Sequence, residues 1–181
     1  MLVFKQAPLL SMQLLWVNLV TDGMPAIALG MEAIENDVMD ESPRPKDESI
    51  FAHHLGERII LQGFLFGDLS LFAFWFAQTT LHSLTAGRTL CFMVLSLSQV
   101  FQSYNMRSHL SLFKIGVFTN HYLNKAALVS FALMAIVLFI PPLATIFGLT
   151  FLPFSYYLIG LGLSMSPILI IEIFKFFHIL H

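Results

Sequence analysis

Residues 16–25, Trp-Val-Asn-Leu-Val-Thr-Asp-Gly-Met-Pro, place a carboxamide, a hydroxyl and a carboxylate inside an apolar run that extends from Leu9 to Gly30. A helix that crosses a bilayer needs about 20 mostly apolar residues, and this run meets that length. A charged side chain near the centre of such a helix costs at least about 2.5–3.5 kcal/mol. Asp22 therefore indicates a functional site within the membrane rather than an ordinary helix surface.

Gly23 and Pro25 follow this carboxylate directly. Proline removes a backbone donor and clashes with the carbonyl group one turn earlier, so the pair predicts a break in the first helix. A break at membrane depth frees carbonyl oxygens, and such backbone is tolerated only where it lines a cavity or packs against protein.

The composition extends the membrane assignment to the whole chain. Of 181 residues, 57% are hydrophobic and 11% are charged, and the mean hydropathy is +0.78. These values exclude a sizeable soluble catalytic domain, and no basic run indicates nucleic acid. The single cysteine, Cys91, excludes an internal disulfide and a cysteine-based zinc cluster.

Five apolar stretches predict an all-α fold, a polytopic bundle of five transmembrane helices with the first broken near Gly23 and Pro25. The bundle is expected to form one domain, residues 1–181. Its predicted helices cover about 9–30, 57–78, 89–106, 126–140 and 154–177, with an acidic cytoplasmic loop at 31–56.

The basic residues orient this bundle, because lysine and arginine concentrate on the cytoplasmic side of a membrane. With the loop 31–56 and the C-terminus in the cytoplasm, most basic residues fall on that side, and two fall outside. The cytoplasmic set is Arg44, Lys46, Arg58, Arg107, Lys114, Lys125 and Lys175, and the external set is Lys5 and Arg88.

Two further features stand out in the predicted helices. The third helix carries an unusual number of polar side chains, among which Ser96, Gln99 and Ser103 share one face at helical spacing. In the second helix, Asp68 lies near the midpoint, where pairing with a basic residue of a neighbouring helix, a place on a proton path and a position nearer the membrane surface all remain open.

Asn18, Thr21 and Asp22 occupy positions i, i+3 and i+4, so a regular helix presents their oxygen atoms on one face. Calcium binds 6–8 oxygen ligands, and this cluster supplies about four at most. Gln99 adds one more. Water, freed carbonyl groups or helices absent from this chain must complete the shell. The alternative is that these side chains only form hydrogen bonds between helices.

The segment from Gln13 to Ala26 resembles the sixth transmembrane helix of the calcium-transporting P-type ATPases. The residues Asp37-Val-Met39, Pro43-Arg44-Pro45 and Glu48-Ser-Ile-Phe51 are similar to the cytoplasmic loop that follows that helix. The later helices match in number, length and spacing. The resemblance implies that the chain corresponds to helices six to ten of such a pump, its C-terminal membrane domain.

The resemblance further implies that Asn18, Thr21 and Asp22 coordinate the transported ion at a break in the helix. Gln99 falls close to the position where pumps with two calcium sites carry a glutamate on the eighth helix. A neutral side chain there is similar to pumps with one calcium site, which implies one ion per cycle. Calcium is the expected ion, and manganese remains open.

The family phosphorylates an aspartate in an Asp-Lys-Thr-Gly-Thr motif, which this sequence lacks. The chain alone is therefore expected not to hydrolyse ATP. ATP and magnesium enter only through an N-terminal portion with the phosphorylation and nucleotide-binding domains, which is the expected partner besides the lipid bilayer. The expected location is the plasma membrane of a prokaryote.

Two other interpretations remain. The chain is a non-enzymatic membrane partner or relic that assembles with a pump or with a separate N-terminal half, or it is an independent carrier or channel. The small number of ligands disfavours the carrier. Whether the chain is a natural split product, a truncation or an excised fragment is open at this stage.

Overall fold

The computed structural model describes residues 6–32, 55–107, 116 and 119–176, and for residues 55, 57, 58 and 172–176 it describes only the backbone. Several expected features lie outside the described residues: nearly all of the loop 31–56, the motifs at residues 37–39, 43–45 and 48–51, and the basic residues Arg44, Lys46 and Lys114.

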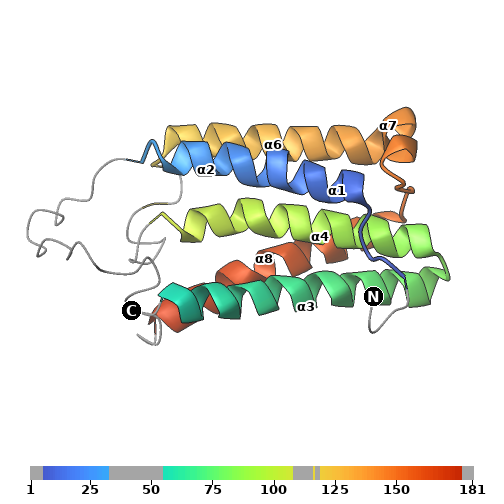
Figure 1. Cartoon of the computed structure of the whole chain (residues 1–181), viewed down its shortest axis with the longest axis horizontal. Coiled ribbons are helices and arrows are strands. Elements are labelled where there is room, and N and C mark those ends of the chain that lie inside the picture. Colours follow the sequence, from blue (N-terminus) through green and yellow to red (C-terminus); the bar gives the residue numbers. More distant parts are fainter. Residues whose placement is uncertain (1–5, 33–54, 108–115, 117–118, 177–181) are drawn as a thin grey trace, which may run out of the picture.

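The described residues form helices, which confirms the all-α fold (Figure 1). The first helical run, residues 11–29, consists of three segments in a row: α1 (Ser11–Trp16), the π-helical turn η1 (Val17–Asp22) and α2 (Gly23–Leu29). The others are α3 (Leu55–Leu81), α4 (Leu84–Asn105), α6 (His121–Phe139), the short α7 (Pro141–Ile146) and α8 (Phe154–Phe176).

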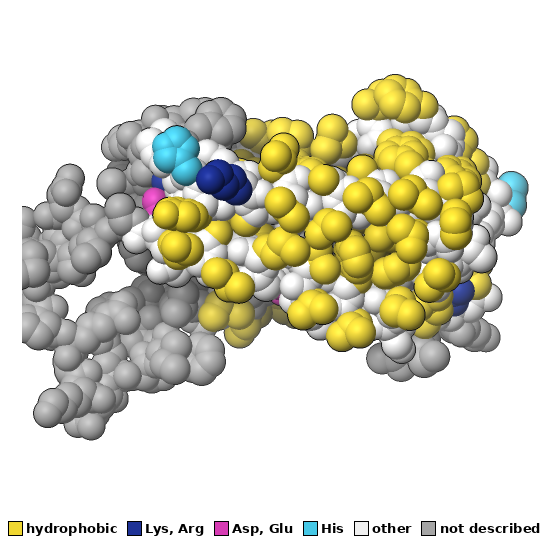
Figure 2. Space-filling view, turned by 90° about the horizontal axis from the view of Figure 1, so that it is seen from above, with side chains coloured by type: hydrophobic (Ala, Val, Ile, Leu, Met, Phe, Trp, Pro, Cys, Tyr) yellow, Lys and Arg dark blue, Asp and Glu magenta, His cyan; other side chains and the backbone are white. Residues whose placement is uncertain are grey.

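Four of these helices, α3, α4, α6 and α8, are long and apolar enough to cross a membrane. Figure 2 shows apolar side chains over the middle of one face of the bundle, with most of the coloured charged groups toward its two ends. This distribution fits a hydrocarbon layer around the middle and water at both ends. The chain is therefore an integral membrane helix bundle.

The central helix is α4, which packs against α3, α8, η1 and α6. In the most apolar 18-residue stretch of α4, 67% is buried inside the bundle, whereas the share is 22% in the corresponding stretches of α3 and α8. This position explains why α4 carries so many polar side chains: they face other helices rather than lipid. The buried polar residues of α4 are Thr89, Ser96, Ser98, Gln102, Ser103 and Asn105.

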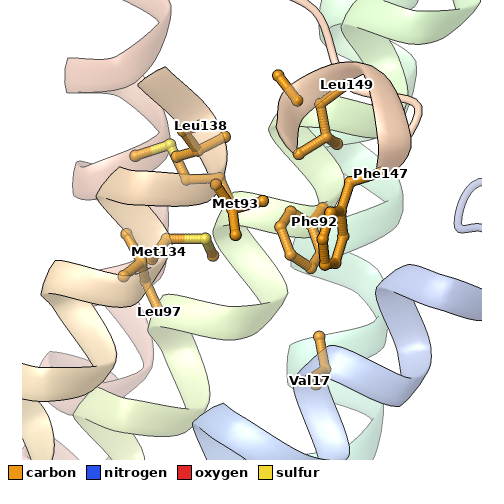
Figure 3. Packing of buried hydrophobic residues seen from close by; sticks show 10 residues of the cluster. Val17, Phe92, Met93, Leu97, Met134, Leu138, Phe147 and Leu149 are labelled. Atoms are coloured by element: carbon orange, nitrogen blue, oxygen red, sulfur yellow. The ribbon is translucent and has the colours of Figure 1, made fainter. Parts of the chain in front are cut away.

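Two apolar clusters fix α4 in place. One joins α4 to η1, α6 and the end of α7 through residues such as Val17, Phe92, Met134 and Phe147 (Figure 3). The other joins α4 to α3 and α8, and small residues such as Ala73 and Ala77 let α3 approach closely.

The first helix differs from the expected break in a specific way. The chain stays helical through Pro25, and the irregular part is the π-helical turn just before it. Pro25 has no amide to donate, and the π-helical turn that precedes it changes the hydrogen-bond register of the helix there. The irregularity thus precedes Gly23 and Pro25, and it includes Asn18 and Asp22.

Side-chain caps explain where two helices begin. α4 begins at Leu84, earlier than the predicted residue 89, because the Ser83 hydroxyl accepts a hydrogen bond from the amide of Ala86. α6 begins at His121, earlier than the predicted residue 126, because Asn120 Oδ1 accepts from the amide of Leu123 at 2.9 Å.

The two prolines after α6 do more than end that helix. Pro141 and Pro142 occupy the first positions of α7, where the fixed backbone angle of proline suits a helix start. The predicted turn between the last two membrane helices therefore contains a short helix of its own.

Gln13 fixes the N-terminal end of the first helix and is fully buried. Its Oε1 accepts from the Leu10 amide at 2.9 Å, and its Nε2 donates to the carbonyl of Phe147 at 2.9 Å. We expect Gln13→Leu to lower the free energy of unfolding in detergent by about 1–3 kcal/mol, because both backbone groups lose their partner. Met12→Leu, at a 47% exposed neighbour, is the matched control and should leave stability unchanged. Equal stability of both variants would contradict this role.

Candidate ion-binding site

The predicted ligands on the first helix all lie in η1. A π-helix bonds each amide to the carbonyl five residues earlier, and such turns occur mostly at functional sites. Thr21 is 1% exposed and faces the bundle, whereas Asn18 and Asp22 are exposed. The single face that a regular α-helix would give these three residues is therefore divided between an inner and an outer side.

Thr21 meets Gln99 of α4 on the inner side. The Thr21 hydroxyl donates to the carbonyl of Val17 at 2.7 Å, and Gln99 Oε1 lies 3.3 Å from the same hydroxyl oxygen. One hydroxyl proton cannot serve both acceptors in a linear geometry, and the shorter contact takes it. The Thr21 and Gln99 oxygens, 78 positions apart in the chain, thus lie side by side.

This spacing suits two ligands of one hard cation. Two oxygens 3.3 Å apart that each lie about 2.4 Å from a calcium ion subtend an angle of about 90°, an ordinary angle in a calcium shell. The pair can therefore supply two neutral oxygens without rearranging the backbone.

Asn18 and Asp22 carry their side-chain oxygens on the outer side of η1. They stand next to Thr21 in sequence, and their exposed side chains face away from the helices that pack on η1. The chain brings Thr21 and Gln99 together and leaves Asn18 and Asp22 open beside them. Such an arrangement can bind a cation fully only when further oxygens approach from the exposed side.

Other polar residues of α4 do not join this group. Ser103 donates to the carbonyl of Val100 at 2.6 Å, and Gln102 accepts from Asn105 at 3.3 Å. Asp68, at the middle of α3, is exposed and makes no ion pair with any residue in the described part of the chain. The described residues also include no group of three His, Cys, Asp or Glu side chains placed to hold a metal.

Sequence reasoning missed a second polar group, at the end of the bundle where α2 and α4 end and α6 begins. We call it the Glu32 cluster: Glu32, Arg107, Thr119 and Asn120. Glu32 was expected in a solvated loop, yet it pairs with Arg107 at 2.7 Å. The hydrogen bond from Arg107 holds the pKa of Glu32 below its ordinary value, although partial burial acts in the opposite direction. Asn120 could be recognised in the sequence as a candidate helix cap, but no pattern indicated the pairing of Glu32 with Arg107.

The bundle, its central polar helix and its irregular first helix define a polytopic membrane protein with polar groups between its helices. The chain matches the family described as "Cation transporting ATPase, C-terminus" over residues 6–177. It therefore belongs to the C-terminal membrane domain of the cation-transporting P-type ATPases.

Curated relatives agree with this assignment. A "Calcium-transporting ATPase" of Bacillus subtilis is 39% identical over 92% of this chain and 19% of its own length. "Calcium-transporting ATPase 1" of Bacillus cereus is 38% identical over 93% of this chain and 21% of its own length. The human "Calcium-transporting ATPase type 2C member 1" is 31% identical over 93% of this chain and 18% of its own length. The chain spans about a fifth of the length of these relatives.

Proposed function

We propose that this chain is the ion-binding membrane portion of a calcium-transporting P-type ATPase. In this proposal Asn18, Thr21, Asp22 and Gln99 supply ligands to the transported ion. The observation that supports it most is that η1 directs its three proposed ligands to two different sides. Thr21 is already paired with Gln99 inside the bundle, and Asn18 and Asp22 face outward beside them.

The chemistry favours a hard cation as the cargo. The four side chains offer oxygen atoms, and Asp22 provides the negative charge that calcium sites require. The names of the relatives support calcium in particular. Manganese shares this preference for oxygen, so a competition assay between the two ions belongs with any transport measurement.

Gln99 sets the expected stoichiometry. Because its side chain is neutral and already lies next to Thr21, the site has one carboxylate, Asp22, among its four proposed ligands. We propose one calcium ion per cycle. A measured stoichiometry of two calcium ions per assembled pump would contradict this part of the proposal.

The missing oxygens and the energy source come from the partner. The exposed side of η1 accepts helices of an N-terminal portion, and that portion also carries the domains that bind ATP with magnesium and become phosphorylated. In this arrangement the pump works in a prokaryotic plasma membrane, with the residue 31–56 loop and the C-terminus in the cytoplasm.

The test replaces the matching segment of the Bacillus subtilis relative with residues 6–177 of this chain. We expect vesicles with this hybrid pump to accumulate calcium when ATP is added, and vesicles with the truncated relative alone to accumulate none. Calcium accumulation by the purified chain without ATP would instead favour an independent carrier. A correctly assembled hybrid without any transport would favour the non-enzymatic partner or relic.

A further inference from the structure

The Glu32 cluster joins three separate parts of the chain at one end of the bundle. Glu32 stands one turn beyond α2, where its amide donates to the carbonyl of Leu29 at 3.0 Å. Arg107 follows the last turn of α4, and Asn120 caps the start of α6. The ends of α2, α4 and α6 therefore meet at one carboxylate.

The contacts between these residues are specific and mostly buried. Arg107 donates from Nε at 3.1 Å and from Nη2 at 2.7 Å to the two oxygens of Glu32, which is a bidentate pair. The Arg107 side chain is 1% exposed and that of Glu32 is 23% exposed. A charge pair of this kind has one strongly preferred geometry, so it fixes the relative position of the segments that carry it.

The remaining donors of this cluster are also used. Arg107 Nη1 donates to the carbonyl of Gly116 at 3.0 Å, and Nη2 also donates to the hydroxyl of Thr119 at 2.7 Å. Asn120 Nδ2 donates to the carboxylate of Glu32 and, at 3.4 Å, to the carbonyl of Ala28 in the last turn of α2. Asn120 thus contacts both the helix end and the carboxylate that follows it.

The opposite end of the same helix is also fixed, because Gln13 bonds to the carbonyl of Phe147. Between these two attachments lies η1, a π-helical turn rather than regular α-helix. A short irregular turn between two fixed ends has its geometry set by those ends. Arg107 directly follows α4, the helix that carries Gln99 about two turns earlier, so one residue links the end of α2 to the helix of a proposed ligand.

We propose that the Glu32 cluster positions the ion site: Arg107 and Asn120 hold the end of α2 against α4 and α6 and thereby set the place of Thr21 relative to Gln99. Arg107 and Glu32 touch no proposed ligand, so they act through the helix ends. The inference rests on the proposed function for its calcium readout, but its structural readout needs no transport at all.

The first experiment uses the whole chain in lipid nanodiscs and follows amide hydrogen exchange of residues 17–29. We expect Arg107→Gln to speed exchange in η1 and α2 about 3- to 30-fold while α3 and α8 keep their protection. Arg88→Gln is the matched control, because Arg88 lies at the opposite end of α4 and its Nε bonds to the carbonyl of Ala7 at 3.1 Å. Equal exchange in the two variants would overturn the proposal.

The second experiment places the same variants in the hybrid pump and measures the calcium concentration that gives half-maximal ATPase activity. We expect Glu32→Gln and Arg107→Gln each to raise it about 3- to 30-fold and to leave the maximal rate per folded pump within about twofold. The double variant should be no worse than Arg107→Gln alone, because the two residues act as one unit.

A merely structural pair would give a different pattern. It would lower the amount of folded pump and leave the half-maximal calcium concentration of the remaining pump unchanged, which would overturn the positioning role. If the unaltered hybrid does not transport calcium, the proposed function fails by itself, and the hydrogen-exchange comparison still decides whether the Glu32 cluster positions η1.

Discussion

In a pump assembled with this chain, Asp22→Asn should raise the calcium concentration required for ATP hydrolysis by about 100- to 1,000-fold, which removes activity at micromolar calcium. The change keeps the size of the side chain and one oxygen but removes the negative charge. Among the proposed ligands only Asp22 is charged, so no other side chain of this chain can replace its attraction for a divalent cation.

Asp68→Asn is the matched control for this experiment. It makes the same chemical change in a second intramembrane aspartate, which is exposed on α3 and outside the proposed site. We expect the calcium concentration that the Asp68→Asn pump requires for ATP hydrolysis to stay within about threefold of the value for the unaltered pump. Full calcium-dependent ATPase activity in Asp22→Asn at micromolar calcium would remove Asp22 as a ligand.

Gly87→Val should have the largest effect on stability. A Cβ atom added at Gly87 would lie 2.9 Å from the carbonyl oxygen of Phe74 and 3.1 Å from Cβ of Gln78. These atoms belong to the facing helix α3, and a backbone oxygen cannot move away without displacing that helix. Overpacking of this kind costs about 1–3 kcal/mol, and we expect the upper end of that range. Unfolding in mixed detergent micelles, followed by circular dichroism, measures the loss.

Gly162→Val provides the control, because Gly162 also lies within a membrane helix, α8, and an added Cβ there meets no atom within 4 Å. The control should keep or slightly raise stability, since valine forms helices better than glycine does. If the two variants unfold at the same detergent fraction, the close approach of α3 and α4 at Gly87 does not determine the stability of the bundle.

The sequence was sufficient to predict four helices of membrane-spanning length, because hydrocarbon imposes a simple rule on length and polarity. It was less informative on where they begin. The start of α4 depends on the hydroxyl of Ser83, and the start of α6 depends on Asn120. Both are local contacts that an apolar run does not reveal. The effect of Pro25 was predicted as a break, but the helix accommodates it with a π-helical turn one step earlier.

Part of the site could be predicted from local spacing in the sequence. Asn18, Thr21 and Asp22 are close in sequence, and their spacing alone indicated a group of oxygen ligands. Gln99 lies 78 positions from Thr21, so spacing could not show that the two are neighbours. The resemblance to the pumps indicated the position of Gln99 instead. No pattern indicated the pairing of Glu32 with Arg107, 75 positions away, because charged residues near a helix end usually face water.

In the proposed function, this chain holds part of an ion site which an N-terminal portion completes. The most direct measurement is calcium binding by the purified chain in nanodiscs beside the assembled hybrid pump, each at micromolar calcium. We predict no specific binding to the chain alone, one calcium ion per hybrid pump, and loss of that ion in Asp22→Asn. Tight calcium binding by the chain alone, or unchanged binding in the Asp22→Asn hybrid, would contradict it.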